Sequence, residues 1–417
     1  MTKAIESPDI PEGWRTMRLG DIANIQFSSV DKKSIEGEEP VGLCNYTDVF
    51  YNRRIHSGIE FMVATARPLE SRRWSLKYGD VLFTKDSETR TEIGVPAFVT
   101  EDMPNILCGY HLGRARPKPG TIDGSYLARS FLSTSVSRQL SRIANGVTRF
   151  GLTLVATKSM TLLVPPLHEQ KAIAEVLDSI DDAIEYTDRL IAATERLHDS
   201  LLHELLTKGL PGWHTEWQEH PNLGTIPAEW RIVGLGQIAS IRKQQVKPEA
   251  HNETPYVGLE HIRSGGSLLG YGRAGNTQSA KTVFKTGDTL FGKLRPNLRK
   301  VARPGFDGVC STDILALFPS QRVNGRYLLG LMSSERIHRL AVRSCAGTRM
   351  PRTSWSFLRG VKIAVPDIRE QAQVAEVLAG VDNAVERMDR EKAALAAFKE
   401  SISDALLTGR VRVPMRT

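Results

Sequence analysis

Hydrophobic positions recur at alternating spacings of four and three residues over one long stretch, from Pro165 to Gly209. Seven of the ten positions at this spacing are Ile or Leu, and the set reads Ile173, Leu177, Ile180, Ile184, Thr187, Ile191, Thr194, His198, Leu201 and Leu205. This spacing keeps an apolar stripe on one face of a helix. No Pro or Gly occurs between Leu167 and Lys208, so the pattern predicts an unbroken helix roughly 60 Å long. A stripe this narrow indicates a partner helix.

Residues 365–409 carry the same pattern. A shift of 201 positions places Glu169-Gln170 on Glu370-Gln371 and Asp181 on Asp382. The two helices could each pack only on their own domain, but their likeness favours an antiparallel pairing with each other. The predicted partner and coiled-coil positions are Ile173, Leu177, Ile180, Ile184, Val374, Leu378, Val381 and Val385.

The internal repeat extends beyond the helices. The opening W-x(4)-L-G-x-I-A at 14–23 returns at 230–239, and the G-D-x-L-F turn at 79–83 returns at 287–291. Gly146, followed by Thr148-Arg149, returns as Gly347 with Thr348-Arg349. The segments between these anchors share almost nothing, as expected if one framework carries different inserts for two targets. The predicted organisation is a first recognition domain at 1–163, a spacer helix at 164–209, a linker at 210–226, a second recognition domain at 227–364, and a helix with tail at 365–417.

Shorter elements are predicted from apolar runs and turn residues. Strands are expected at 81–83, 97–99, 160–164, 314–318 and 361–365, and helices at 125–143 and 325–343. The predicted fold class is α/β (α+β), with two pseudo-repeated domains of short-stranded mixed sheets, antiparallel or barrel-like. Two long helices that form an antiparallel coiled coil join the domains.

The net charge of +8 is unevenly distributed. Residues 165–208 hold ten acidic and four basic side chains, and residues 366–408 hold nine and five. The helices therefore carry −6 and −4, and the rest of the chain carries +18. Basic domains joined by acidic helices favour a polyanion such as DNA as the partner of the domains. The acidic helices are more suited to holding protein.

Catalytic and cofactor motifs are missing. The sequence has neither the glycine-rich loop and Asn/Asp-Pro-Pro-aromatic motif of a DNA methyltransferase nor G-x(4)-G-K-[ST] for ATP. Gly234-Leu235-Gly236 is interpreted as a turn, because its counterpart is Arg18-Leu19-Gly20. The ten histidines and four cysteines show no metal-binding spacing. The chain has no run of 18 apolar residues and no signal core, so we expect a cytoplasmic protein without membrane contact.

The candidate DNA-binding residues are basic and amide side chains in the divergent inserts and turns. Arg and Lys can pair with guanine edges and Asn with adenine, although each could instead meet phosphate or only solvent. The predicted set is Lys85, Arg90, Arg149, Lys293, Arg295, Asn297, Arg299, Lys300 and Arg349. Further basic candidates are Arg53, Arg54, Lys243 and Arg263.

These openings, turns, G-x-(x)-T-R segments and V-P-P-L-x-E-Q-x-x-I-A-E-V-L helix starts resemble the specificity subunits of type I restriction-modification systems. The second copy departs from the family pattern at Pro366-Asp367, where the first has a proline pair. The resemblance implies a non-catalytic subunit that reads double-stranded DNA, one half of a bipartite asymmetric site per domain. It also implies that the helices set the spacing and dock two methyltransferase subunits, which bring S-adenosylmethionine and methylate adenine N6. An ATP- and Mg-dependent restriction-translocase subunit is a further expected partner.

Two alternatives remain open at this stage. The chain could be the specificity subunit of a related type II system, or a coiled-coil scaffold without base recognition. A lone methyltransferase or nuclease is disfavoured by the missing motifs.

Overall fold

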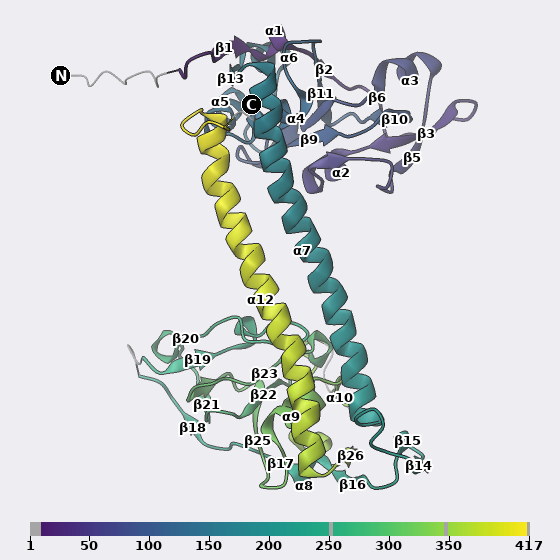
Figure 1. The fold of residues 1–417 in the computed structure, drawn as a ribbon, viewed down its shortest axis with the longest axis vertical. Coiled ribbons are helices and arrows are strands. Elements are labelled where there is room, and N and C mark those ends of the chain that lie inside the picture. Colours follow the sequence, from purple (N-terminus) through teal and green to yellow (C-terminus); the bar gives the residue numbers. More distant parts are fainter. Residues whose placement is uncertain (1–9, 250–252, 346–348, 415–417) are drawn as a thin grey trace, which may run out of the picture. The chain divides into compact units, whose positions relative to one another are not determined.

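The computed structural model describes residues 10–249, 253–345 and 349–414. The chain forms two compact units, one made of residues 1–186 and 392–417 and the other of residues 187–391. The long helices α7 (Leu167–Thr207) and α12 (Ile368–Leu407) each contribute to both units (Figure 1). Each unit therefore contains one globular domain and one segment of each long helix. The spacer helix predicted at 164–209 corresponds to α7, and the helix predicted at the start of 365–417 corresponds to α12.

Short strands build the mixed sheets of the first domain (Figure 1). The strand orders are β1 (Arg15–Arg18) with β13 (Thr161–Val164); β5 (Met62–Ala66), β3 (Glu39–Cys44), β10 (Met103–Cys108) and β6 (Ser75–Leu76); β2 (Ala23–Phe27), β11 (Leu112–Pro117), β7 (Val81–Thr84), β9 (Pro96–Val99) and β4 (Arg54–Ile55); and β8 (Asp86–Ser87) with β12 (Phe150–Gly151). Most pairs are antiparallel, whereas β3–β10 and β4–β9 are parallel. The helices are α1 (Leu19–Ile22), α2 (Tyr46–Tyr51), α3 (Pro68–Trp74), α4 (Gly124–Phe131), α5 (Thr134–Ile143) and α6 (Leu154–Ser159).

The second domain repeats this plan, but its inserts carry short 3₁₀ helices where those of the first domain carry α-helices. Its strand orders are β14 (Trp217–His220) with β15 (Gly224–Pro227); β16 (Arg231–Gly234) with β26 (Lys362–Val365); β17 (Ala239–Ile241), β25 (Ile314–Pro319), β22 (Thr289–Gly292) and β23 (Val301–Ala302); and β18 (Gln245–Val246), β21 (Lys281–Phe284), β24 (Gly308–Cys310), β19 (Pro255–Val257) and β20 (Gly272–Arg273). The helical elements are α8 (Leu235–Ile238), η1 (Leu259–His261), η2 (Ala274–Asn276), η3 (Pro296–Leu298), α9 (Gly325–Ser333), α10 (Glu335–Arg343) and α11 (Trp355–Leu358). The hairpin β14–β15 overlaps the predicted linker.

The repeated openings fold alike, as strand, one-turn helix and strand. The first strand of each opening pairs with the strand that precedes the long helix, with Arg15 opposite Val164 and Arg231 opposite Val365. In both units this pairing joins the start of the domain to the start of its helix.

The helices predicted at 125–143 and 325–343 are each two helices, so the prediction of single helices was wrong. The break falls at matched serines, and each serine caps the second helix. Ser133 Oγ accepts from the Val136 amide at 3.3 Å, and Ser334 Oγ accepts from the Ile337 amide at 3.4 Å. A serine N-cap satisfies an amide that would otherwise lack a partner. The five predicted strands appear as β7, β9, β13, β25 and β26.

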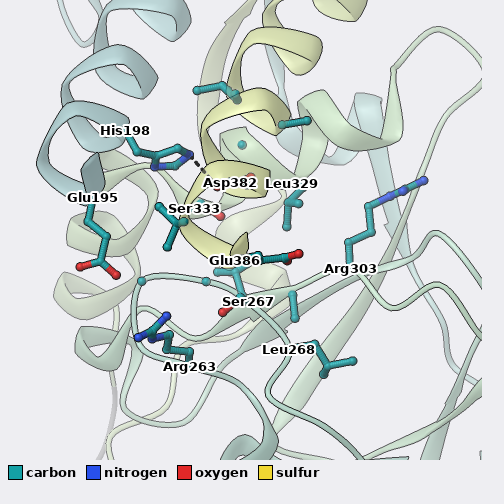
Figure 2. Close-up of a pocket in the computed structure, with 18 of the residues that line it drawn as sticks. Glu195, His198, Arg263, Ser267, Leu268, Arg303, Leu329, Ser333, Asp382 and Glu386 are labelled. Atoms are coloured by element: carbon teal, nitrogen blue, oxygen red, sulfur yellow. Dashed lines mark ion pairs between the residues drawn. The ribbon is translucent and has the colours of Figure 1, made fainter. Parts of the chain in front are cut away.

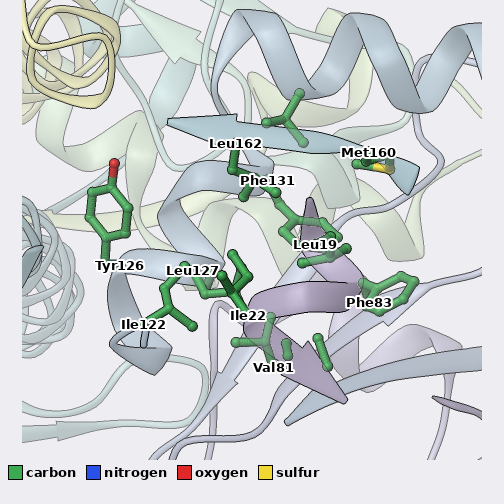
Figure 3. Packing of buried hydrophobic residues seen from close by; sticks show 14 of the residues in the cluster. Leu19, Ile22, Val81, Phe83, Ile122, Tyr126, Leu127, Phe131, Met160 and Leu162 are labelled. Atoms are coloured by element: carbon green, nitrogen blue, oxygen red, sulfur yellow. The ribbon is translucent and has the colours of Figure 1, made fainter. Parts of the chain in front are cut away.

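The core of the first domain also holds the long helices. Around Phe83 and Leu19, apolar side chains from strands and helices pack together (Figure 3). Ile173 and Leu177 of α7 belong to this cluster, and the second domain's cluster contains Val374 and Leu378 of α12. The other predicted seam residues are half-buried, namely Ile180, Ile184, Val381 and Val385. Burial is therefore greatest where a long helix packs against a domain, since Leu202 of α7 also belongs to the second domain's cluster and Leu406 of α12 to the first domain's cluster.

Each unit by itself shows that the two long helices run antiparallel. In the first unit, Asp181 pairs with Lys399, and Glu169 Oε1 near the start of α7 lies 2.5 Å from Nε of Arg412, which follows the end of α12. In the second unit, His198 Nε2 lies 3.2 Å from Asp382 Oδ1, and just beyond the end of α7 the Leu210 amide donates to Glu370 Oε1 at 3.2 Å. Residue numbers rise along α7 while they fall along α12, so the predicted antiparallel arrangement is confirmed within each unit.

Candidate nucleic-acid interface

The first candidate surface lies where β7 ends and the short antiparallel pair β8–β12 begins. This pairing places Gly151 opposite Asp86 and so joins two segments that are distant in the sequence. Arg149 Nη2 lies 3.1 Å from Asp86 Oδ1, and His111 Nδ1 lies 2.9 Å from Asp86 Oδ2. One carboxylate therefore orients both a guanidinium and an imidazole.

The two other predicted residues of this surface contact aromatic rings. Lys85 Nζ lies 4.1 Å from the centre of the Tyr110 ring and donates to the Ser28 carbonyl at 3.3 Å. Burial lowers the pKa of Lys85. The Arg90 guanidinium lies 4.8 Å from the centre of the Phe150 ring, and its side chain is exposed. Arg90 is thus accessible to DNA, whereas Lys85 is partly enclosed.

The second candidate surface occupies the matching place after β22. Leu294 forms an isolated antiparallel bridge with Arg352, where Asp86 faces Gly151 in the first domain. The Lys293 carbonyl also accepts from the amide of Thr353 at 3.0 Å. The framework is therefore shared, but the side chains it presents differ between the domains.

A tight turn flanked by two arginines follows. Arg295 and Arg299 both have φ of 50° and enclose the 3₁₀ helix η3. Non-glycine residues rarely adopt this left-handed conformation, and it is enriched at functional sites. Arg299 Nη2 lies 3.0 Å from Asp199 Oδ1 of α7, and Lys300 Nζ donates to the Leu259 carbonyl at 2.6 Å. Arg299 and Lys300 therefore make intramolecular contacts.

The remaining predicted residues of the second domain are available to a ligand. Within the described ranges, the side chains of Lys293, Arg295, Asn297 and Arg349 make no hydrogen bond or ion pair. Arg295, Asn297 and Arg349 are exposed, and Lys293 is half-buried. Gly347 and Thr348, which supported Arg349 as a candidate, lie outside the described residues.

A buried histidine supports the arginine turn and was not anticipated. His338 Nδ1 donates to the Pro296 carbonyl at 3.1 Å, and the ring stacks on Phe291 with centroids 5.2 Å apart. Burial lowers the pKa of His338 to about 4, and the nearby Arg299 acts in the same direction. The neutral ring thus fixes the position of η3 through its hydrogen bond to Pro296. His338 lies on an ordinary amphipathic helix, so nothing in the sequence singled it out.

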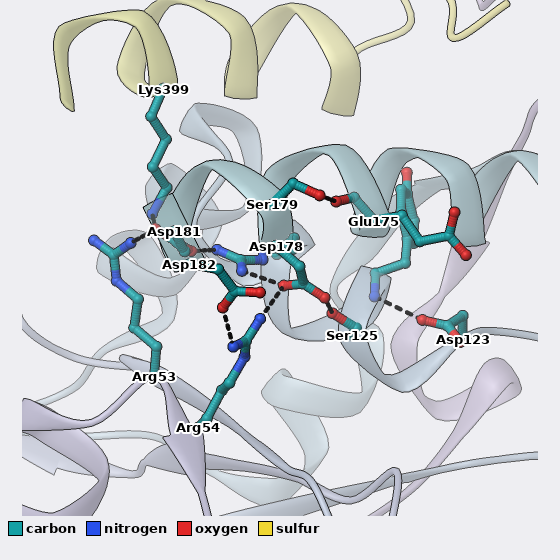
Figure 4. A network of polar contacts seen from close by, with 12 residues as sticks. Arg53, Arg54, Asp123, Ser125, Glu175, Asp178, Ser179, Asp181, Asp182 and Lys399 are labelled. Carbon is teal, nitrogen blue, oxygen red and sulfur yellow. Dashed lines mark hydrogen bonds and ion pairs between the residues drawn. The ribbon is translucent and has the colours of Figure 1, made fainter. Parts of the chain in front are cut away.

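The acidic helices bind their own domains. Arg129 of α4 pairs with both Asp178 and Asp181 of α7, and its side chain is buried. Arg53 also forms an ion pair with Asp181, and Arg54 Nη2 lies 3.6 Å from Asp178 Oδ1 (Figure 4). These ion pairs anchor the first domain on α7. They also engage Arg53 and Arg54, two of the further basic candidates for DNA binding.

The second domain is anchored more sparsely. Arg263 Nη1 lies 2.5 Å from Asp389 Oδ2 of α12, and hydrogen bonding to this carboxylate raises the pKa of Arg263. Together with Arg299–Asp199, this pair fixes the second domain to both helices. Lys243 is exposed.

The described ranges contain neither a metal-binding cluster nor a membrane-spanning helix. No group of three or more His, Cys, Asp or Glu side chains there could hold a metal ion. None of the helices in those ranges combines the length and apolar composition that a bilayer-spanning segment needs.

Comparisons with known proteins agree with this architecture. Residues 11–196 match the family model described as the type I restriction modification DNA specificity domain. The MjaVIII type I restriction enzyme specificity subunit of Methanocaldococcus jannaschii is 24% identical, covering 97% of this chain and 94% of that protein. The EcoDI specificity subunit of Escherichia coli is 25% identical over 52% of this chain and 53% of its own length. A crystal structure of a type I restriction-modification S subunit from M. genitalium has a similar fold, with a TM-score of 0.58 and 14% identity over 99% of both chains.

Proposed function

We propose that the chain is a DNA specificity subunit of a type I restriction-modification system, and on this basis we propose how its parts divide the work. Each domain reads one half of a bipartite asymmetric DNA site. The two long helices set the distance between the half-sites and dock two methyltransferase subunits. The chain itself performs no catalysis.

The observation that carries this proposal is the difference between two matched surfaces. After the repeated G-D-x-L-F strand, the first domain presents Arg149 with Asp86 and His111, while the second presents Arg295 and Asn297. A carboxylate accepts from cytosine, whereas arginine and asparagine favour guanine and adenine. One framework with two sets of base-edge chemistry suits two different half-sites.

The charge distribution supports the same division. The chain outside the helices carries +18, which favours phosphate contacts. Part of the acidic charge of the helices is neutralised by Arg129, Arg263 and Arg299, which anchor the domains. In this proposal the methyltransferase subunits bind S-adenosylmethionine and methylate adenine N6, and a restriction subunit that joins them uses ATP and Mg. A related type II system would use the same recognition with a different partner.

A domain exchange tests the proposal. Residues 227–364 are replaced by the corresponding domain of a related subunit, and methylated adenines are mapped by single-molecule sequencing in a host with the partner subunits. We expect changed bases in one half of the site, with the other half unchanged. Changed bases in both halves or in neither, or methyl transfer by the purified chain alone, would refute the proposal.

A further inference from the structure

The lysine after the repeated G-D-x-L-F strand has equivalent backbone partners in the two domains. In the first domain, the Lys85 amide donates to the His111 carbonyl at 3.1 Å, and the Lys85 carbonyl accepts from the Leu152 amide at 2.8 Å. In the second domain, the Lys293 amide donates to the Asp313 carbonyl at 2.9 Å. Together with the contact between Lys293 and Thr353, these hydrogen bonds allow the two surfaces to be compared position by position.

The comparison assigns an equivalent to each side chain of the surface. Asp313 stands where His111 stands in the first domain. The isolated bridge to the end of β22 places Arg352 where Gly151 lies in the first domain. The second domain therefore has a carboxylate in the place of an imidazole and an arginine in the place of a glycine.

The two domains build the same ion pair from different positions. In the first domain, Arg149 pairs with Asp86. In the second, Nε and Nη2 of Arg352 lie 2.8 Å and 3.4 Å from the two carboxylate oxygens of Asp313. Neither member of the pair occupies a matched position, yet each surface presents a guanidinium that a carboxylate holds in place.

Stability does not account for the pair in the second domain. The side chain of Arg352 is 40% exposed and that of Asp313 is 25% exposed, and an ion pair in such a setting adds little to stability. The pair instead fixes the plane of the guanidinium. Nη1 makes only a long hydrogen bond among the described residues, to the Met350 carbonyl at 3.4 Å. The edge of the guanidinium that carries Nη1 is thus available to a ligand.

Arginines that anchor the second domain are paired differently. Arg263 lines the cavity that the domain forms with α7 and α12, and it pairs with Asp389 of α12 (Figure 2). Arg299 pairs with Asp199 of α7. Both members of the pair that contains Arg352 belong to the domain itself, so this pair does not hold the domain on the helices.

We propose that Arg352 reads a guanine of the second half-site and that Asp313 is the positioning residue that presents it. Arginine can donate from two nitrogens to O6 and N7 of guanine in the major groove. A guanidinium that is already held by a carboxylate loses less conformational freedom when it binds. The inference rests on the proposed function, since it requires that the second domain reads one half of the site.

The test uses the complete complex with the methyltransferase subunits and measures its affinity for duplexes of the site that methylation mapping defines. Each guanine of the second half-site, in either strand, is replaced in turn by deazaguanine, which has a carbon in place of N7. The variants are Arg352→Ala, Arg352→Lys, Asp313→Asn, and Asp313→Asn combined with Arg352→Ala. The control is Arg410→Gln, which removes an exposed arginine paired with Asp404 outside the second domain.

We expect the wild-type complex to lose about tenfold or more in affinity when one particular guanine is replaced, because a bidentate contact is broken. Arg352→Ala should remove this dependence at that position alone. Arg352→Lys should remove it as well, since lysine keeps the charge but lacks the planar fork. Asp313→Asn should weaken the dependence at the same position, and the double variant should resemble Arg352→Ala. The control should resemble wild type.

Thermal unfolding of each free chain identifies a variant that fails to fold, and the other Arg352 variant then decides. Wild-type guanine dependence in a folded Arg352 variant would overturn the inference, as would a second half-site without guanine in either strand. Equal weakening for all sequences in Arg352→Ala, restored in Arg352→Lys, would overturn it by assigning a phosphate contact. Unchanged dependence in Asp313→Asn would overturn the positioning role. If the wild-type complex shows no sequence preference, the proposed function itself fails, which is a distinguishable result.

Discussion

The indole Nε1 of Trp14 donates a hydrogen bond to Glu169 Oε2 over 3.1 Å, and both side chains are buried. The second unit repeats the pair as Trp230 and Glu370, at 3.0 Å. The repeated tryptophan belongs to the opening of each domain, and the glutamate belongs to the first turn of each long helix. This bond explains why the two motifs recur together.

The neighbouring glutamine reinforces the joint. Gln170 accepts from the Asp123 amide at 2.7 Å, and Gln371 accepts from the Asn324 amide at 2.9 Å. Asp123 and Asn324 are the N-cap residues of α4 and α9. Each glutamine therefore binds the residue at which a domain helix begins. The Glu-Gln pair is therefore a structural clamp between helix and domain.

The first prediction concerns this clamp in the second unit. Glu370 also accepts from His214 Nε2 at 2.8 Å and from the Leu210 amide at 3.2 Å. Glu370→Ala leaves several buried donors without an acceptor, so we expect a loss of about 3–5 kcal/mol in the free energy of unfolding. Urea denaturation followed by fluorescence measures it. Glu376→Ala, at an exposed position of α12, is the control and should change stability by about 0.5 kcal/mol or less. Equal effects would contradict the clamp.

The long helices and the domain framework could be predicted because their signals are local and repeated. An uninterrupted apolar stripe fixes α7 and α12, and strands such as β7 and β25 are short apolar runs bounded by turns. The break at Ser133 was missed because the apolar spacing continues across it, from Phe131 to Val136 and Leu140. A serine is compatible with both a helix interior and an N-cap, so only the backbone geometry decides.

The ion pairs of the candidate site could not be predicted. Arg295 and Arg299 are identical in type and four positions apart, yet among the described residues only Arg299 has an acidic partner, Asp199. That difference depends on the left-handed turn between them and on how the domain packs on α7. Neither is encoded in residue spacing. The same holds for Arg129, which the sequence presents as an ordinary basic residue of an amphipathic helix.

The second prediction concerns the packing of α7 on the first domain. Leu177 is 1% exposed within the domain core. We expect Leu177→Ala to lower the free energy of unfolding by about 2–5 kcal/mol, because it removes buried methyl groups and leaves a cavity. Leu190, on the same helix, is 42% exposed, and Leu190→Ala should cost about 0.5 kcal/mol or less. Urea denaturation measures both. Similar losses in the two variants would mean that the buried face of α7 is assigned incorrectly.

The third prediction concerns pH. The pKa of His338 is about 4 in the folded protein, and an unfolded histidine titrates at about 6.5. Between these values the unfolded chain binds a proton that the folded chain does not. The free energy of unfolding therefore falls as the pH is lowered through this window, by at most about 1.4 kcal/mol per pH unit, and the loss levels off below pH 4.

A matched variant isolates this contribution. His338→Phe keeps an aromatic ring on Phe291 and removes the titrating group. Unfolding temperatures are measured from pH 7 to pH 4.5 for both proteins. We expect a shallower decline for the variant, since all other groups titrate alike in the two chains. Parallel declines would show that His338 is not held neutral by the fold.

The last prediction separates a DNA-binding arginine from an anchoring one. Arg295 is exposed without an ion-pair partner among the described residues, whereas Arg299 is paired with Asp199. Glycine is the matched substitution at both positions, because it adopts φ of 50° without strain. DNA binding by the complete complex is measured at several salt concentrations, for the cognate site and for single-base variants of it.

If Arg295 reads a base, Arg295→Gly should relax discrimination at one position of the second half-site by about 1–3 kcal/mol. If it meets phosphate, affinity should fall similarly for all sequences, and the slope of log K against log salt should decrease by about 0.9. Arg299→Gly should leave both quantities close to wild type and instead lower the stability of the second unit, because it removes the contact with α7. An unchanged affinity, salt slope and specificity in Arg295→Gly would remove Arg295 from the interface. A loss of specificity in Arg299→Gly with normal stability would assign recognition to the paired arginine.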